Sequence, residues 1–280
     1  MTRSSAEAAA VQAMSRQHAA GAGSARGLLF TVLGEFVLPS GGTVWTSTVI
    51  NVLGRLGVEE KATRQALMRT AGDDWLTAGR HGRRTRWRLT PAAEQLLTDG
   101  TQRIYGFHGA APFWDGRVVL VLARVPESDR ATRHMLRSRL GWAGFGSPAP
   151  GMWISPHTER AAEAGRLLAM AGVSDARIFV AEHVGGADLA SMVRQAWDLG
   201  SVEASYREFL TEFGGDAGEP LARLVELVHA WRRFPAIDPA LPRELLPSPW
   251  SGERAAGLFT ELHARWTAGA KAEWALLESV

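Results

Sequence analysis

Hydrophobic residues in the first third of the chain recur with the period of an α-helix in three consecutive stretches. Residues 26–38 carry leucine, valine and phenylalanine every three or four positions, and residues 44–53 repeat this spacing. After a short turn containing Gly57, residues 58–70 place small and apolar side chains on one side and polar ones on the other. The pattern predicts three helices, of which the last two are joined as in a helix-turn-helix.

A β-strand pattern follows these helices. Residues 75–77 form a short predicted strand, and residues 86–90 alternate between apolar and arginine side chains. The stretch 78–85 between them contains two glycines and is predicted to be the loop of a hairpin. Pro91 then suits the first position of a helix that extends to about residue 98.

Polar side chains of the third helix and the hairpin form a candidate DNA-binding surface. The helix carries donors for guanine, adenine and phosphate oxygens, and the hairpin arginines are crowded enough to favour a bound anion such as a phosphate backbone. The candidate base-reading residues are Lys61, Arg64, Gln65 and Arg69, and the candidate backbone-binding residues are Arg80, Arg83, Arg84 and Arg86. Either set alone also fits an ordinary solvated surface, but their order and spacing together predict a winged helix-turn-helix. Trp45 and Trp75 are expected in the core of this module.

The remainder of the chain has first a mixed and then a helical pattern. Short apolar runs at residues 117–125, 152–154 and 177–181 predict buried strands, with helices over residues 129–140 and 158–171 and a short strand near residues 142–146. The resulting order is βαββαβ, as in a ferredoxin-like domain. From residue 188 onward the apolar residues again follow the helical period.

The sequence therefore predicts an α+β fold with three consecutive domains. Residues 25–105 are assigned to the winged helix-turn-helix, residues 110–185 to the ferredoxin-like domain, and residues 186–280 to a C-terminal α-helical domain. Residues 1–24 are rich in alanine, serine and glycine and are predicted to be a disordered tail.

Several motifs occur in order along residues 25–275. They are Leu28–Pro39, Gly41-Gly42, Val44-Trp45-Thr46, Arg64-Gln65-Ala66-Leu67 with Arg69, Gly82-Arg83-Arg84, Trp87–Pro91, Tyr105-Gly106-Phe107, Trp114-Asp115-Gly116, Arg139–Gly146 and Trp231–Pro235. Together they resemble the PaaX family of transcriptional repressors. The resemblance implies a one-component regulator that binds palindromic double-stranded operator DNA as a homodimer. It also implies release by a small effector, since the type member of the family responds to phenylacetyl-coenzyme A.

Composition and charge agree with a DNA-binding regulator and exclude several other classes. Residues 1–105 hold 13 lysines and arginines against 8 acidic residues, whereas residues 106–280 hold 18 against 21. The absence of cysteine excludes disulfides and thiolate metal sites and suits the cytoplasm. No stretch is apolar enough to span a membrane. The common phosphate-loop, zinc-protease and hydrolase motifs are missing, and we expect no cofactor, no metal and no enzymatic activity.

A second set of arginines is a candidate effector site. Arg130, Arg133 and Arg137 recur along one side of a predicted helix, and arginine binds the phosphates of coenzyme A through paired hydrogen bonds. The full candidate set is Arg130, Arg133, Arg137, Trp142, Arg232 and Arg233, in which the tryptophan stacks on an aromatic group of the effector. The alternative is that this side is simply solvated or is an additional DNA-facing surface.

Two other functions remain open from the sequence. The ferredoxin-like unit resembles small endoribonuclease-like proteins of CRISPR systems, which makes a metal-dependent nuclease the alternative function. Such an enzyme needs carboxylates gathered on a metal, and Asp115, Glu127 and Asp129 around the first strand form no obvious cluster. A regulator that works through protein partners without a small ligand is the third possibility.

Overall fold

A computed structural model describes residues 24–107, 114–186, 188–215 and 218–279. The predicted disordered tail lies outside these residues, apart from Ser24, whose side chain accepts a hydrogen bond from the Gly27 amide and caps the first helix. The structure contains both helices and sheets and is therefore α+β, as predicted. No helix among the described residues is both long and apolar enough to cross a membrane.

The chain forms two compact units that each combine separate stretches of sequence. Of the described residues, those within 1–107, 209–233 and 254–280 form the first unit, and those within 108–208 and 234–253 form the second. Helices from the stretch 186–280 thus contribute to both units. The three consecutive domains expected from the sequence remain a prediction.

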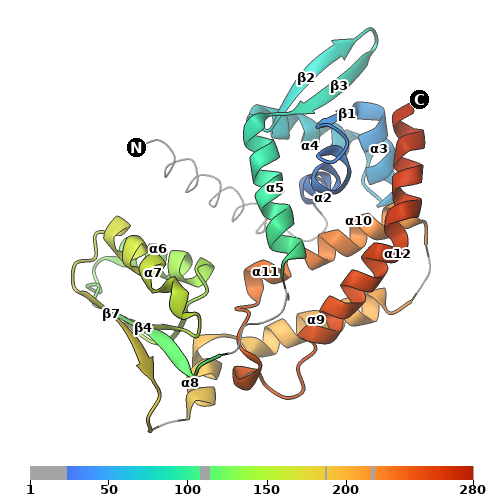
Figure 1. Ribbon diagram of the computed structural model, residues 1–280. Helices are drawn as coiled ribbons and strands as arrows, with labels where there is room; N and C mark the ends of the chain where they lie inside the picture. Colours follow the sequence, from blue (N-terminus) through green and yellow to red (C-terminus); the bar gives the residue numbers. More distant parts are fainter. Residues whose placement is uncertain (1–23, 108–113, 187, 216–217, 280) are drawn as a thin grey trace. The chain divides into compact units, whose positions relative to one another are not determined.

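The first unit contains the predicted DNA-binding elements and the last helices of the chain (Figure 1). In chain order its elements are α2 (Ala25–Val32), the π-helix η1 (Leu33–Val37), β1 (Thr43–Trp45), α3 (Thr46–Arg55), α4 (Glu60–Gly72), β2 (Leu76–His81), β3 (Arg84–Leu89), α5 (Pro91–Tyr105), the end of α9 (Leu199–Phe213), α10 (Pro220–Trp231) and α12 (Gly252–Ser279). The three helices predicted before the hairpin are confirmed, and the apolar residues of the first are buried.

The hairpin β2–β3 differs from its prediction in length. Pairing runs without interruption from Leu76 opposite Leu89 to His81 opposite Arg84, so that only Gly82 and Arg83 form the turn. Gly82 has a φ of 61°, a conformation that glycine adopts without a steric penalty. The predicted loop over residues 78–85 was therefore mostly wrong, because its small and polar residues lack the apolar alternation that marks a half-buried strand.

A third strand, which the sequence analysis missed, completes this sheet. Strand β1 pairs antiparallel with β3, with Val44 opposite Trp87, and the sheet order is β1-β3-β2. The sequence had predicted a helix from residue 44 onward. Three residues are too few for a recognisable strand pattern, and β1 is defined by pairing with residues more than forty positions away.

The final helix packs against the start of α3. The Thr48 hydroxyl donates to the Leu277 carbonyl at 3.2 Å, and the Trp45 amide lies 3.4 Å from the Glu278 carboxylate. The ring of Phe36 stacks on Trp274 with centroids 5.0 Å apart. These contacts hold η1, β1 and α3 against a helix from the other end of the chain.

The second unit is built on a four-stranded antiparallel sheet. Its sheet and the adjoining helices, in chain order, are β4 (Arg117–Ala123), α6 (Arg130–Trp142), β5 (Gly146–Ala149), β6 (Met152–Ser155), the short 3-10 helix η2 (Thr158–Arg160), α7 (Ala161–Met170) and β7 (Ala176–Glu182). The strand order β5-β6-β4-β7 with this βαββαβ succession is the ferredoxin-like arrangement predicted. The short strand expected near residues 142–146 begins only at Gly146, since Trp142 still belongs to α6.

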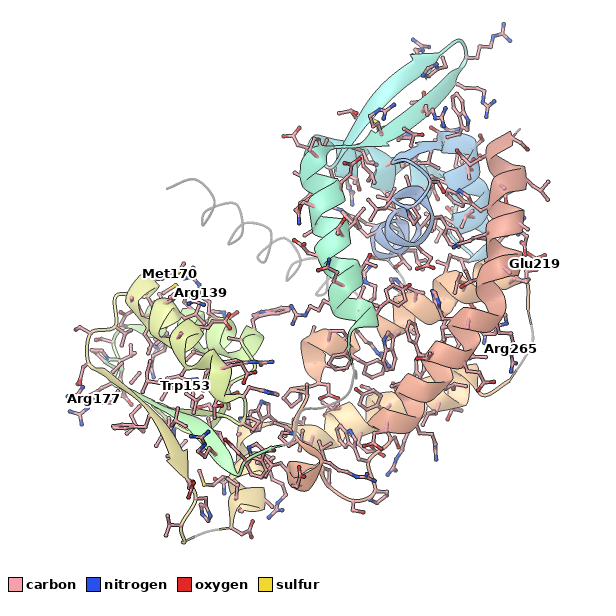
Figure 2. The ribbon with its side chains drawn as sticks, viewed as in Figure 1. Arg139, Trp153, Met170, Arg177, Glu219 and Arg265 are labelled. Atoms are coloured by element: carbon pink, nitrogen blue, oxygen red, sulfur yellow. The ribbon has the colours of Figure 1, made fainter. Side chains whose placement is uncertain are left out.

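Helices α6 and α7 supply the apolar side chains that cover one face of this sheet. Trp153 of β6 (Figure 2) is buried together with Val119 and Val121 of β4, Leu136 of α6 and Leu168 of α7. The remaining elements of the unit are α8 (Leu189–Ala196), the first part of α9, α11 (Phe234–Ile237) and the 3-10 helix η3 (Arg243–Leu245). The sheet is thus a packed structural element with its own core.

Candidate nucleic-acid interface

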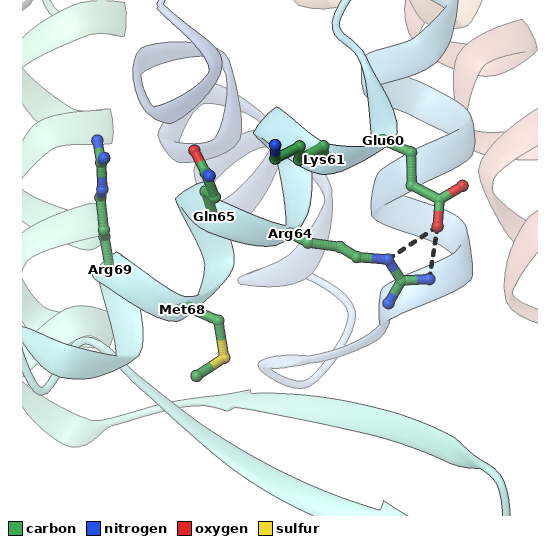
Figure 3. A pocket seen from close by; sticks show the side chains of 6 residues that line it. All are labelled: Glu60, Lys61, Arg64, Gln65, Met68 and Arg69. Atoms are coloured by element: carbon green, nitrogen blue, oxygen red, sulfur yellow. Dashed lines mark hydrogen bonds and ion pairs between the residues drawn. The ribbon is translucent and has the colours of Figure 1, made fainter.

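Helix α4 has one buried and one exposed side, as its sequence predicts. Thr63, Ala66, Leu67 and Thr70 are buried against the rest of the first unit. The exposed side carries Lys61, Arg64, Gln65, Met68 and Arg69, which together with Glu60 line an open hollow (Figure 3). All four candidate base-reading residues therefore lie on one accessible helix face.

Arg64 is paired within its own helix. Its Nε and Nη2 atoms lie 2.8 Å and 2.7 Å from the same oxygen, Oε1 of Glu60, one helical turn earlier. Both side chains are more than half exposed, at 58% and 59%. An exposed ion pair at this spacing adds little to stability, and here it turns the Nε and Nη2 edge of the guanidinium toward Glu60.

The hairpin arginines lie on both strands and on the turn between them. Arg80 belongs to β2, Arg83 to the turn, and Arg84 and Arg86 to β3. All except Arg86, which is half-buried, are exposed. The candidate backbone-binding residues are thus distributed along a projecting hairpin (Figure 1).

Trp45 lies beneath two of these arginines. The guanidinium carbons of Arg84 and Arg86 are 4.1 Å and 5.0 Å from the centre of the Trp45 ring, within the range of a cation–π interaction. The ring of His81 meets it edge-on at 5.6 Å. Trp45 is half-buried, so its predicted place in the core was wrong, because the indole supports charged side chains on its outer face.

A chain of hydrogen bonds joins the hairpin to the start of α3. The buried Trp87 donates from its ring nitrogen to the Thr46 hydroxyl at 2.9 Å, and that hydroxyl donates to the Thr85 carbonyl at 3.1 Å. Since the hydrogen bonds satisfy the buried indole N–H, they favour one position of the hairpin relative to α3.

Helix α4 and the hairpin meet at a second hollow of about 440 Å³. It is lined by Thr46, Ser47, Ile50 and Asn51 of α3, Glu60 and Arg64 of α4, and Arg83, Arg84 and Thr85 of the hairpin. Arg64 and the two hairpin arginines therefore share one surface of the first unit. The α3 residues were missed by sequence reasoning. They could have been identified from their position in the chain. They lie in the first turns of the helix before the turn, and in helix-turn-helix proteins that helix crosses the DNA backbone.

The candidate effector residues fall in both units. Arg130, Arg133 and Arg137 are exposed on α6, and Trp142 is half-buried at its end. Arg133 donates to the Glu127 carbonyl at 2.6 Å. Neither of the two hollows is lined by any of these residues.

Arg232 and Arg233 follow α10 in the first unit. The Arg232 guanidinium donates to the Gly27 carbonyl at 3.0 Å and to the Thr31 hydroxyl at 3.1 Å, both on α2. Burial lowers the pKa of Arg232 to about 10. Its side chain is thus engaged in holding α10 against α2. Arg233 is half-buried.

The described residues contain no group of three or more histidine, aspartate or glutamate side chains placed to hold a metal ion. Titratable groups with shifted pKa values instead lie in hydrogen-bonded pairs or clusters. In the first unit, burial would raise the pKa of Glu35, but hydrogen bonds from His263 and Tyr105 outweigh it and lower the pKa. Burial, together with the Glu35 carboxylate, raises the pKa of Tyr105.

Comparison with known proteins places this chain among regulators. Sequence models of protein families match residues 24–93 (PaaX-like protein), 111–193 (PaaX protein central Cas2-like domain) and 197–275 (PaaX-like protein C-terminal domain). The chain is 30% identical over 272 residues to the transcriptional repressor PaaX of Escherichia coli strain K12, an alignment that covers 89% of this chain and 83% of that protein. The chain belongs to the PaaX family.

A solved structure has the same fold as this PaaX-family chain. It is the uncharacterized protein Rv0674 from Mycobacterium tuberculosis, which is similar with a TM-score of 0.63 and 23% sequence identity. The similarity covers 91% of this chain and 98% of the other. At this level of identity the comparison supports the fold alone.

Proposed function

We propose that this PaaX-family chain is a transcriptional repressor whose residues 25–105 form a winged helix-turn-helix that binds operator DNA. The observation that supports this most is the shared hollow, in which Arg64 of α4 and Arg83 and Arg84 of the hairpin face one space. The family relationship to a named repressor adds independent support. The chain then acts in the cytoplasm on double-stranded DNA and is not an enzyme.

The two sets of residues have different roles in this proposal. Helix α4 enters the major groove, where Lys61, Arg64 and Gln65 donate to base edges and Arg69 reaches a base or a phosphate. The hairpin residues Arg80, Arg83, Arg84 and Arg86 bind backbone phosphates, which positions the helix without reading sequence. The ring of Trp45 keeps two of these guanidinium groups extended toward the DNA.

Regulation follows from the pairing of two such modules. A homodimer places two copies of α4 on the half-sites of a palindrome about one DNA turn apart. An acyl-coenzyme A thioester such as phenylacetyl-coenzyme A then favours an arrangement in which the copies no longer match the half-sites. In this proposal, residues 110–185 form a ferredoxin-like domain and residues 186–280 form a helical domain, and both domains serve regulation.

The effector set becomes smaller than the sequence suggested. Arg130, Arg133, Arg137, Trp142 and Arg233 remain candidates. Arg232 is left out, because its guanidinium already donates to α2 and is buried. Thermal unfolding of the full chain in the presence of acyl-coenzyme A thioesters tests for an effector, since a ligand that binds only the folded state raises the unfolding temperature.

The salt dependence of DNA binding tests the hairpin assignment. The double variant Arg83→Ala/Arg84→Ala removes two phosphate contacts, so the slope of log K against log salt becomes shallower by about 2. Affinity for all duplexes falls together, because phosphate contacts carry no sequence information. The measurement is fluorescence anisotropy with the full chain and labelled duplexes over a series of salt concentrations.

A matched control removes the same charge elsewhere in the same unit. Arg254 and Arg265 are exposed on α12, where Figure 2 labels Arg265. The double variant Arg254→Ala/Arg265→Ala leaves the hairpin intact. We expect its slope to equal that of the unchanged chain. A slope that is the same in the hairpin variant and in the unchanged chain contradicts the proposed function of the hairpin.

A further inference from the structure

The pairing of Glu60 with Arg64 places a carboxylate in the middle of a surface that is otherwise suited to a polyanion. Both residues line the hollow along α4 and also the hollow shared with the hairpin. A carboxylate there repels phosphate, and the exposed pair contributes little to folding. If the proposed DNA-binding function holds, we therefore expect the Glu60 carboxylate to have a role in binding.

The geometry of the pair leaves Arg64 able to bind a base. Glu60 accepts from Nε and Nη2, which form the side edge of the guanidinium. A guanidinium carries five N–H groups, so three remain, including the pair on its end edge. That end edge has two parallel N–H donors, which is what a bidentate contact with O6 and N7 of guanine requires. Figure 3 shows the second terminal nitrogen of Arg64 outside the paired edge.

The same pairing makes Arg64 a poor phosphate ligand. The carboxylate neutralises the charge of the guanidinium, and any phosphate that approaches Arg64 also approaches Glu60. Hairpin residues Arg83 and Arg84 line the same hollow, and neither is described in an ion pair with Glu60. The arginines that line this hollow therefore have different roles. Arg64, which is paired with Glu60, contacts a base, and Arg83 and Arg84 bind phosphates.

We propose that Glu60 is a specificity-determining positioning residue, which holds the Arg64 guanidinium for a guanine and keeps it off the phosphate backbone. The proposal rests on the proposed DNA-binding function and extends it to a residue that does not itself need to touch DNA. Replacing Glu60 should therefore raise the affinity for DNA of any sequence and lower the ratio of the affinities for preferred and scrambled duplexes.

The test compares a preferred duplex with a scrambled one. The unchanged full chain first selects a preferred duplex from a random double-stranded library. Anisotropy over a salt series then gives affinities for the selected and scrambled duplexes. In Glu60→Ala we expect binding to the scrambled duplex to tighten several-fold, and the salt slope to steepen by about 0.9 as Arg64 gains a phosphate. The ratio of the two affinities should fall roughly ten-fold, the discrimination of one bidentate base contact.

Three further variants exclude a general charge effect. Glu59→Ala removes the same charge one residue earlier, where the exposed side chain makes no described ion pair, and should change both affinities by equal factors. Glu60→Gln keeps an accepting oxygen without the charge and should retain part of the discrimination. In Arg64→Ala, the further change Glu60→Ala should no longer alter the ratio, because the residue it positions is gone.

The outcomes separate this inference from the function on which it rests. If the unchanged chain selects no sequence and its binding is insensitive to salt, both proposals are wrong. If the unchanged chain selects a sequence but Glu60→Ala leaves the ratio as it was, only the role of Glu60 is overturned. An equal effect of Glu59→Ala and Glu60→Ala on the ratio also overturns it.

Discussion

The contact between α10 and α2 makes the stability of the first unit sensitive to pH. His229 lies at the end of α10 with its Nδ1 atom 2.9 Å from the Thr31 hydroxyl, and the Arg232 guanidinium donates to the same hydroxyl. Burial, and secondly the charge of Arg232, lowers the pKa of His229 from its ordinary value of 6.5 to about 4. The imidazole is therefore neutral in the folded chain at neutral pH.

The sign of the effect follows from this lowered pKa. Between the two pKa values the unfolded chain binds a proton at His229 and the folded chain does not, so acidification favours unfolding. Stability is fully present above the unfolded pKa and declines as the pH falls toward 4. At roughly 1.4 kcal/mol for each pKa unit, the contribution lost is about 2 kcal/mol at pH 5 and about 3 kcal/mol at pH 4.

The variant His229→Asn isolates this contribution from other titrating groups. The asparagine amide takes the approximate place of the imidazole Nδ1, so the contact with Thr31 is retained in a side chain that does not titrate. Urea unfolding of the full chain and the variant, followed by circular dichroism, gives two stability curves between pH 8.5 and pH 5. The difference between them should be constant above pH 7.5 and should shift by about 2 kcal/mol in favour of the variant at pH 5.

Two results would refute this reasoning. One is a difference between the curves that is independent of pH, and the other is a His229 resonance that titrates near 6.5 in the folded chain. Nuclear magnetic resonance of the imidazole protons measures the second directly. Either result means that the ring is solvated, in contradiction to its packing against α2.

Two other perturbations test different parts of the first unit. Glu35 is 10% exposed and lies 3.0 Å from His263, so Glu35→Gln should lower the free energy of unfolding by about 2 kcal/mol at neutral pH. Because hydrogen bonds from His263 and Tyr105 outweigh burial and lower the Glu35 pKa, this loss should shrink as the pH falls through that pKa, which urea unfolding over a pH series measures. Trp45→Leu removes the platform under Arg84, so DNA affinity should fall about five-fold with an unchanged salt slope in anisotropy titrations. A shallower slope would mean that the variant loses phosphate contacts.

Local patterns in the sequence predicted most of the secondary structure. The helical spacing between residues 26 and 70 identified α2, α3 and α4, and the alternation after residue 86 identified β3. Likewise, the exposed side of α4 was readable, since the residues at helical spacing from Leu67 had to be buried. These features depend on side chains within a few positions of each other.

Contacts between distant residues were not readable in the same way. Strand β1 exists because Val44 pairs with Trp87, and Trp45 is held at the surface by arginines from the hairpin. Arg232 was predicted to bind the effector, but its guanidinium donates to Gly27 and Thr31 of α2. Each of these depends on contacts between residues at least 39 positions apart, for which the sequence contains no periodic signal.

The sequence by itself determined most of the helices and strands, the βαββαβ succession, the uneven charge and the resemblance to the PaaX family. The tertiary structure alone decided that Arg64, Arg83 and Arg84 line one hollow and that the last helices join the first unit. The physical reason is that periodicity records which side of an element is buried. It does not record the partner that buries it, because any apolar surface of suitable shape satisfies the same pattern.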